Sequence, residues 1–554
     1  MNSADIIIIN ARVLTMNGQA RRAEAMAITG NRIAMVGNKA DCLALKANHT
    51  RMIDAGMKTV MPGIVESHVH LFGGAVELDT LMVNNIKSLQ ALSDSVSQHR
   101  KSRPDLAVIV ATGTAHENFG AEGPITRQLL DRIVPDIPFI MWCFDHHTVW
   151  ANSVALDRAG LMHGRELPTG NAIVLDGSGL ATGELREPAA YMPVLALTPT
   201  SGREWLGLTT GEDPSPVATP AQRRVDEAYM KRGIAHAVSL GITTLHNMDG
   251  NWYQLELLQS LLDRGELHAR VEVPFHHKNY FEVARVDEAV AMREKYQGGM
   301  LHSGRVKIFM DGVLETTTAL MLDDYPGFPG NTGAPLFTPE AFNQIATRAD
   351  AHRLRISVHA VGEGAVRRTL DGYEAARQTN GPRDARHRIE HIEVIDPADI
   401  ARFRQLGVIA SMQPIAGLGV PGNPLEPCLT RIGRKLPYSY AWRTIRDSGA
   451  VLAFSSDWPV APLDPFLGMQ AAMTVKPLRP DCPPQAQSLI DTLHSFTLAS
   501  AYCEAAEHEK GMLREGYFAD VAILDADLEA VEPGQISTVK PVITICDGRV
   551  TFER

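Results

Sequence analysis

The sequence predicts an α/β protein built on a closed (β/α)8 barrel, and three observations carry this prediction. Short apolar runs alternate with helical stretches such as residues 221–240 and 341–352, which is typical of a parallel sheet. Eight strands of this kind can be placed, and eight alternating units indicate a closed barrel rather than an open sheet. The two ends of the chain differ from this pattern and are rich in short β runs.

The similar ends predict one small β-sandwich domain. Ala4–Ile9 and Arg32–Gly37 near the start have counterparts in Ala519–Leu524 and Ile543–Val550 near the end. We therefore expect residues 1–62 plus 501–554 to form this composite domain. The metal-dependent barrel would then occupy residues 63–500.

All eight barrel strands are predicted within residues 63–500. We expect them to end near His70, Met248, Phe275, Asp311, Val361, His391, Met412 and Asp457. Residues 71–221, between the first strand and the helix before the second strand, are too many for a simple loop. They predict an inserted lobe that serves as a lid, with its own strands at 107–111 and 137–144.

The composition of this 554-residue chain indicates which classes of partner it binds. It carries 53 Lys and Arg against 64 Asp and Glu, a formal net charge of −11, which argues against nucleic acid or an anionic membrane and favours a small-molecule ligand. Six widely spaced cysteines without a C-x-x-C pair indicate reduced, mostly buried thiols.

No run reaches the ~18 apolar residues that a membrane helix needs. The start of the sequence does not have the pattern of a signal peptide. We therefore expect a cytoplasmic protein.

Two histidines close the first predicted strand, in Pro62-Gly63-Ile64-Val65-Glu66-Ser67-His68-Val69-His70. At i and i+2 in a strand they share one face, and at the C-terminal rim of a barrel that face points into the active-site mouth. A pair spaced H-x-H is weak evidence on its own. Its value depends on what the other strand ends contribute.

The other strand ends contribute polar residues at matching intervals. They are Lys307 on strand four, His359 on strand five, His391 on strand six and Asp457 on strand eight. From His359 to His391 is 32 residues, close to one βα unit, and from His391 to Asp457 is 66, close to two. Imidazoles and carboxylates in such a set suit Zn²⁺ or a similar divalent ion.

These motifs resemble those of the amidohydrolase superfamily of metal-dependent hydrolases. The residues that carry the resemblance are Pro62-Gly63 with His68-Val69-His70, the run from Asp145 to Ser153, Val306–Gly312, Val358-His359-Ala360, Arg388–His391 and Ser456–Pro459. Within the superfamily the sequence is most similar to the branch that includes N-substituted formamide deformylases. The resemblance spans nearly the whole chain and is more specific for fold and metal chemistry than for substrate.

The resemblance implies a centre of one or two divalent ions per chain. One ion would be held by His68, His70 and Asp457, a second by His359 and His391, and a carboxylated Lys307 would bridge them. An unmodified ammonium cannot bind a cation, so Lys307 carries a carbamate, is deprotonated, or is not a ligand and pairs with Glu187 or another acid. Glu187 is also an alternative bridging ligand.

The resemblance also suggests catalytic roles. Asp457 would take a proton from the attacking water and pass it to the leaving nitrogen. His147 would face the substrate or stabilise an oxyanion, with a structural, hydrogen-bonded histidine as the alternative. Asp311, on the same strand as Lys307, would position substrate or cap its loop, and capping is the favoured interpretation.

The function expected from these residues is hydrolysis of a C–N bond, in the amide of an N-acyl or N-formyl amine. One alternative is a cyclic-amide or amidine hydrolase, or a deaminase, of the same superfamily. Another is a metal-free interaction scaffold, which the six filled ligand positions argue against. A homodimer is the commonest arrangement for a soluble oligomer and is possible here.

Overall fold

The computed structural model describes residues 3–19, 21–84, 86–114, 119, 123–143, 148–168, 170–420, 423 and 425–554. The chain divides into two compact units, each described by itself. The first unit comprises Met1–Leu71 and Ile234–Arg554, and the second comprises Phe72–Gly233. The second unit overlaps the predicted insert at 71–221.

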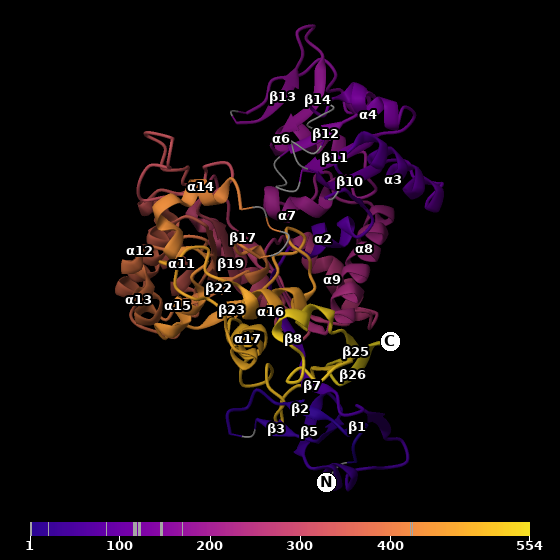
Figure 1. Cartoon of the computed structure of the whole chain (residues 1–554), viewed down its shortest axis with the longest axis vertical. Helices are drawn as coiled ribbons and strands as arrows, with labels where there is room; N and C mark the ends of the chain where they lie inside the picture. The colour runs from indigo at the N-terminus through magenta and orange to yellow at the C-terminus, as the bar shows by residue number, and fades with distance from the viewer. Residues whose placement is uncertain are drawn as a thin grey trace. The chain divides into compact units, whose positions relative to one another are not determined.

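The two ends of the chain share a sheet in the first unit (Figure 1). One sheet has the order β5-β4-β1-β6 and the other the order β26-β25-β24-β7-β2-β3. Their strands are β1 (Ile6–Ile9), β2 (Arg12–Leu14), β3 (Arg22–Ala23), β4 (Ala25–Thr29), β5 (Arg32–Gly37), β6 (Arg51–Asp54), β7 (Thr59–Pro62), β24 (Val521–Leu524), β25 (Pro541–Cys546) and β26 (Arg549–Glu553), with helix α1 (Lys39–Leu43) between β5 and β6. Buried apolar side chains from both sheets, among them Ile8, Val13, Val521 and Ile545, form one cluster.

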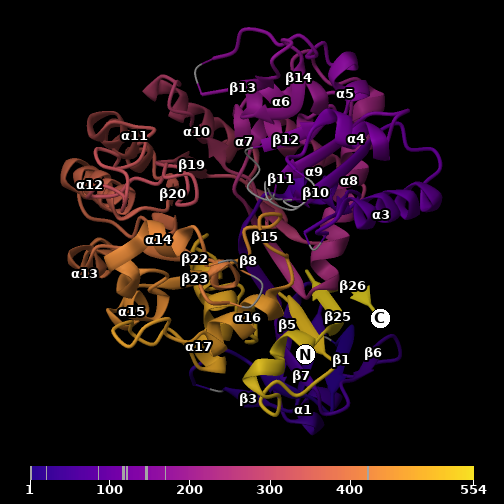
Figure 2. The same cartoon turned by 45° about the horizontal axis from the view of Figure 1, so that its top comes forward.

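Ten further strands of the first unit pair in parallel within two sheets, of order β18-β16-β15-β8 and β17-β19-β20-β21-β22-β23 (Figure 2). They are β8 (Ile64–Val69), β15 (Ile242–Asn247), β16 (Arg270–Glu272), β17 (Phe275–His276), β18 (Leu301–His302), β19 (Arg305–Phe309), β20 (Arg355–Ala360), β21 (Arg388–His391), β22 (Ile409–Met412) and β23 (Leu452–Phe454). Each of the eight predicted strand ends lies within or up to three residues beyond one of these strands. The fold class is α/β, as predicted. Because the strands fall into two sheets, the closed barrel stays a prediction.

The segment after β23 lies beside the end of β8. Val69 and Trp458 form an isolated parallel bridge. Asp457 N donates to His68 O at 3.0 Å, and His70 N donates to Trp458 O at 2.7 Å. These bonds bring strand ends that are distant in sequence to one place, and they set the position of Asp457.

Helices connect the parallel strands, as the sequence predicts. The connecting helices are α9 (Trp252–Asp263), α10 (Val286–Lys295), α11 (Pro339–Ala351), α12 (Glu363–Asn380), α13 (Pro397–Leu406), α14 (Cys428–Ile432) and α15 (Trp442–Asp447). Three more helices follow β23, the last parallel strand: α16 (Pro465–Thr474), α17 (Leu489–Phe496) and α18 (Leu498–Tyr502). In α11, Thr338 caps the start by accepting from Ala341 N, and Phe342, Ile345 and Ala349 are buried at helical spacing. The predicted helices at 341–352 and 221–240 are confirmed as α11 and α8 (Pro220–Ser239).

The second unit contains a mixed sheet of order β13-β14-β12-β11-β10-β9. Its strands are β9 (Leu81–Met82), β10 (Ile109–Thr114), β11 (Phe139–Cys143), β12 (Thr148–Ala151), β13 (Ala172–Leu175) and β14 (Ala181–Arg186), and its helices include α2 (Leu71–Glu77, which begins at the last residue of the first unit), α3 (Leu89–Ser102), α4 (Arg127–Ile133), α5 (Ser153–Arg158), α6 (Pro188–Leu195) and α7 (Leu206–Thr209). The strands predicted near 107–111 and 137–144 correspond to β10 and β11.

Two further findings concern the whole chain. All six cysteines lie within the described residues, where none forms a disulfide, and five of them are buried, as predicted. Among the described residues, no helix is both long enough and apolar enough to span a bilayer.

Candidate metal centre

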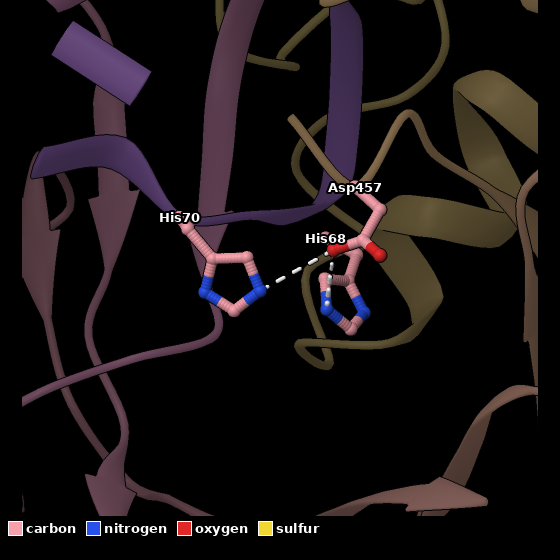
Figure 3. A group of neighbouring side chains, drawn as sticks. All are labelled: His68, His70 and Asp457. Atoms are coloured by element: carbon pink, nitrogen blue, oxygen red, sulfur yellow. Dashed lines mark ion pairs between the residues drawn. The ribbon is translucent and has the colours of Figure 1, made fainter. Parts of the chain in front are cut away.

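His68, His70 and Asp457 converge at the end of β8 (Figure 3). His68 lies within β8 and His70 directly follows it, so the two-residue spacing puts both rings on one side. Asp457 follows β23 with a positive φ of 62°, which turns its side chain toward them. One ligand atom from each of the three lies within 4.8 Å of the others. The structure therefore brings together three of the six predicted ligands as one tight group.

The facing atoms of this group suit a cation. Asp457 Oδ1 lies 3.2 Å from His68 Nε2 and 3.3 Å from His70 Nε2. Within the described part of the chain, neither Asp457 Oδ1 nor His68 Nε2 makes a hydrogen bond, although both atoms are buried. Buried polar atoms without partners are costly. Two imidazole nitrogens and a carboxylate oxygen are ligands that Zn²⁺ and similar ions accept, so the residues fit a divalent ion.

The electrostatics favour the ligating form of two of these side chains. Burial, assisted by the positive charge of Lys307, lowers the pKa of His68 to about 3 and keeps its ring neutral. Burial alone would raise the pKa of Asp457, but the neighbouring imidazoles of His68, His70 and His391 outweigh it and lower that pKa. For His70, the effect of burial is outweighed by the hydrogen bond to Asp249 and the adjacent carboxylate of Asp457, which raise the pKa to about 9. A cation bound at His70 would therefore displace a proton.

His359 and His391 lie next to this group. The ring of His391 is 5.0 Å from that of His68 and 4.5 Å from that of His359, measured between centroids. His391 Nδ1 donates to Gln413 Oε1 at 3.0 Å and lies 3.9 Å from Asp457 Oδ2. Burial lowers the pKa of both rings. Among the described residues, however, the tight cluster of ligand atoms contains only His68, His70 and Asp457.

Lys307 on β19 is fully buried near the histidines. Its Nζ makes no hydrogen bond within the described residues and lies 4.7 Å from the ring centroid of Phe309. Burial lowers the pKa of Lys307 to about 8. The bridging role and the carbamate stay predictions.

Three other residues were candidates from the sequence: His147, Glu187 and Asp311. His147 lies outside the described residues. Glu187 is the N-cap of α6 in the second unit, with a φ of 66°. Asp311 accepts from the backbone N–H groups of Leu320, Val361 and Gly362 at 2.7, 3.0 and 2.9 Å, which confirms the capping interpretation.

Three residues of the site have no role in the sequence analysis. Glu390 Oε2 lies 2.9 Å from His68 Nδ1, Asp249 Oδ1 lies 3.3 Å from His70 Nδ1, and Gln413 binds His391. Glu390 and Asp249 are each one residue from a predicted strand end, and this position is the only indication in the sequence that they belong to the site. Their contacts depend on neighbouring strands, so spacing within one strand does not reveal them.

Comparison with known proteins supports the motif resemblance. The chain is 27% identical over 533 residues to Protein LONG AFTER FAR-RED 3 of Arabidopsis thaliana, covering 95% of this chain and 88% of the relative. It is 24% identical over 561 residues to an N-substituted formamide deformylase of Arthrobacter pascens, covering 99% and 98%.

Among solved structures, the fold is similar to that of an uncharacterized metal-dependent hydrolase from Pyrococcus horikoshii OT3. The TM-score is 0.74 at 24% sequence identity, with 96% of this chain and 99% of that chain covered. The sequence profile of the amidohydrolase family matches residues 51–552, which includes both parallel sheets and the residues of the metal centre. The resemblance inferred from the motifs is thereby confirmed, and the chain belongs to the amidohydrolase family.

Proposed function

We propose that this protein is a metal-dependent hydrolase that cleaves the C–N bond of an N-acyl or N-formyl amine. The observation that carries the proposal is the buried convergence of His68, His70 and Asp457, whose facing nitrogen and oxygen atoms suit a divalent cation. Membership of the amidohydrolase family supports a hydrolase. The similarity to a formamide deformylase over nearly the whole length of both chains supports the substrate class.

We also propose that the two parallel sheets form one closed (β/α)8 barrel. The Val69–Trp458 bridge supports closure where the first and last predicted strands meet. At the other junction, Val273 and Pro274 alone separate β16 in one sheet from β17 in the other. In such a barrel the loops after the strands form the active-site mouth, and these loops carry the candidate ligands.

His68, His70 and Asp457 would hold the first divalent ion, with Zn²⁺ the favoured metal. His359, His391 and a carboxylated Lys307 would hold a second. A bound ion of this kind polarises a carbonyl group and lowers the pKa of a water molecule. The lowered pKa of Lys307 supports carboxylation, because the neutral amine is the form that takes up CO2.

The position of Asp457 supports a role as the proton carrier. Its Oδ1 faces the two Nε2 atoms of His68 and His70, whereas Oδ2 is directed toward His391 at 3.9 Å. As the water oxygen bonds to the carbonyl carbon, Oδ2 accepts a proton from that water. Asp457 then gives the proton to the nitrogen as the C–N bond breaks, so that a neutral amine departs.

The test is hydrolysis by the zinc-loaded protein of a panel of N-acyl amines, N-acyl amino acids, formamides and cyclic amides. We expect amine release from the acyclic amides. The Asp457→Asn variant should lose turnover and retain most of the metal. The matched control is Asp464→Asn, a residue of the same segment that caps α16 and pairs with Lys540, and it should keep turnover.

Three results would contradict the proposal. Release from cyclic amides alone would replace the substrate class with the ring-opening alternative. A near-normal kcat for Asp457→Asn would remove Asp457 as the proton carrier. Absence of both metal and activity in the wild-type protein would favour an interaction scaffold.

A further inference from the structure

His68 and His70 both place their second ring nitrogen against a buried carboxylate. His68 Nδ1 lies 2.9 Å from Glu390 Oε2, and His70 Nδ1 lies 3.3 Å from Asp249 Oδ1. The Glu390 and Asp249 side chains are 0% and 1% exposed. An ionised carboxylate can only accept a hydrogen bond, so in the neutral rings the hydrogen sits on Nδ1. The lone pair of each Nε2 is then directed toward Asp457 Oδ1.

Each carboxylate is itself held in place. Arg388 Nε lies 2.6 Å from Glu390 Oε1, and the same guanidinium donates through Nη2 to Ser67 O at 2.9 Å. Arg388 thus joins Glu390 on β21 to the residue that precedes His68 on β8. Asp249 Oδ2 accepts from Gln254 Nε2 at 2.8 Å. Turning Glu390 away from His68 would break its ion pair with Arg388, and turning Asp249 away from His70 would break its hydrogen bond from Gln254.

The other two histidines make their hydrogen bonds to neutral groups. His391 Nδ1 donates to the amide oxygen of Gln413, and His359 Nε2 donates to the backbone carbonyl of Gly312 at 3.2 Å. The Nδ1 atoms of His68 and His70 are therefore within hydrogen-bonding distance of a carboxylate, whereas Asp311 Oδ1 lies 3.8 Å from His359 Nε2 and Asp457 Oδ2 lies 3.9 Å from His391 Nδ1. A carboxylate at the far nitrogen makes an imidazole a stronger donor to a metal ion.

We propose that Glu390 and Asp249 are positioning residues of the metal centre, which fix the tautomer and ring orientation of His68 and His70 and raise their affinity for the cation. The inference rests on the proposed metal-dependent function and adds two residues to it. Neither residue touches the reacting atoms. Their effect is exerted through the histidines.

The experiment compares Glu390→Gln and Asp249→Asn with the matched control Glu272→Gln. Glu272 is also a fully buried carboxylate of a parallel strand, and it pairs with Arg305 and Arg355 at 2.9 Å rather than with a ligand histidine. The dissociation constant of the metal-free protein for Zn²⁺ is measured by competition with a chromophoric chelator. The visible spectrum of each Co²⁺-loaded form reports the coordination independently of activity.

We expect Glu390→Gln and Asp249→Asn each to weaken the tightest Zn²⁺ site by about 10- to 100-fold and to alter the Co²⁺ spectrum. Glu272→Gln should stay within about threefold of the wild type and keep the wild-type spectrum, even if its metal-free form melts at a lower temperature. Thermal unfolding of the metal-free proteins identifies which variants are folded. Should Glu390→Gln fail to fold, Asp249→Asn carries the test alone.

Wild-type affinity in the folded variants would overturn the inference while leaving the proposed function intact. An equal loss in Glu272→Gln would also overturn it, because the effect would then come from disturbance of the buried core. A wild-type protein that binds no divalent metal would instead contradict the proposed function, and with it the inference.

Discussion

Two lysines lie near the ring of Phe309, which stacks on the candidate ligand His359. Lys307 Nζ is 4.7 Å and Lys278 Nζ 5.8 Å from the ring centroid. Burial lowers the pKa of both lysines to about 8, and for Lys278 the charge of Lys307 adds to the effect. Similar environments make them a matched pair for testing which lysine belongs to the metal centre.

Lys307→Ala should reduce the metal content from about two ions per chain to about one, because the bridging ligand of the second ion is lost. Lys278→Ala should keep both ions. Elemental analysis of the purified, zinc-loaded proteins gives the stoichiometry. An unchanged metal content in Lys307→Ala would show that the bridge is another residue, such as Glu187, or that there is none.

Glu390 belongs to the Arg388–His391 motif, but the sequence pattern alone does not place it in the site. Alternation along a strand places Glu390 and His391 on opposite faces. The backbone departs from alternation here, since His391 and Ile392 have φ values of 74° and 51°. This turn at the end of β21 allows Glu390 to reach His68 while His391 lies beside it.

At the scale of elements, α11 and α12 are linked to the segment before β21 by one carboxylate. Asp350 in α11 accepts from Asn380 Nδ2 at 2.9 Å and Arg383 Nε at 2.6 Å, and lies 3.2 Å from His387 Nε2. Burial would raise the pKa of Asp350, but hydrogen bonds from His387 and Asn380 and the charge of Arg383 lower it to about 2. An unfolded Asp titrates near 4.

Asp350→Asn should therefore lower the free energy of unfolding by about 2 kcal/mol at neutral pH. Because the folded pKa lies below the unfolded value, this contribution is complete above about pH 4 and is lost as the pH falls toward 2. Urea unfolding at pH 7, 5, 4 and 3 measures the difference between variant and wild type. It should stay constant from pH 7 to 5 and shrink below pH 4.

The control is Asp287→Asn on α10, whose partner Arg348 also lies on α11. Both side chains of this ion pair are well exposed, at 50% and 39%, so its loss should cost less than about 1 kcal/mol. Equal destabilisation by the two variants would contradict a special role for the buried carboxylate.

At the scale of the whole molecule, buried charges tie the terminal sheet to a parallel sheet within the first unit. Arg270 on β16 pairs with Asp520 and Asp547 at 2.8 Å, and its guanidinium stacks on the Phe518 ring at 3.9 Å. The candidate ligands His68, His70 and Asp457 make a second long-range connection, between β8 and the segment after β23. A cation bound there would act as a crosslink between distant parts of the sequence.

Removal of the metal should consequently lower the Tm of the protein by several degrees. A ligand at 100 times its dissociation constant stabilises the folded state by about 2.7 kcal/mol. Calorimetric scans of the zinc-loaded protein, the chelated protein and the chelated protein reloaded with zinc measure the effect. Reloading should restore the Tm.

The variant with both His68 and His70 replaced by Asn is the control, and its Tm should respond to zinc less than that of the wild type. If chelation leaves the Tm of the wild type unchanged, the crosslink does not exist in the folded protein.

The sequence by itself determined the α/β class, the positions of the strand ends and the two-residue spacing of His68 and His70, because these follow from local apolar periodicity and strand geometry. The interval from His391 to Asp457 likewise predicted that both belong to one site. Tertiary structure decided which atoms face one another. Only the pairing of Val69 with Trp458 places Asp457 Oδ1 between two Nε2 atoms, and only the turn at His391 places Glu390 against His68. Contacts of this kind depend on strand register and on single backbone angles, and neither is encoded in the spacing of residue types.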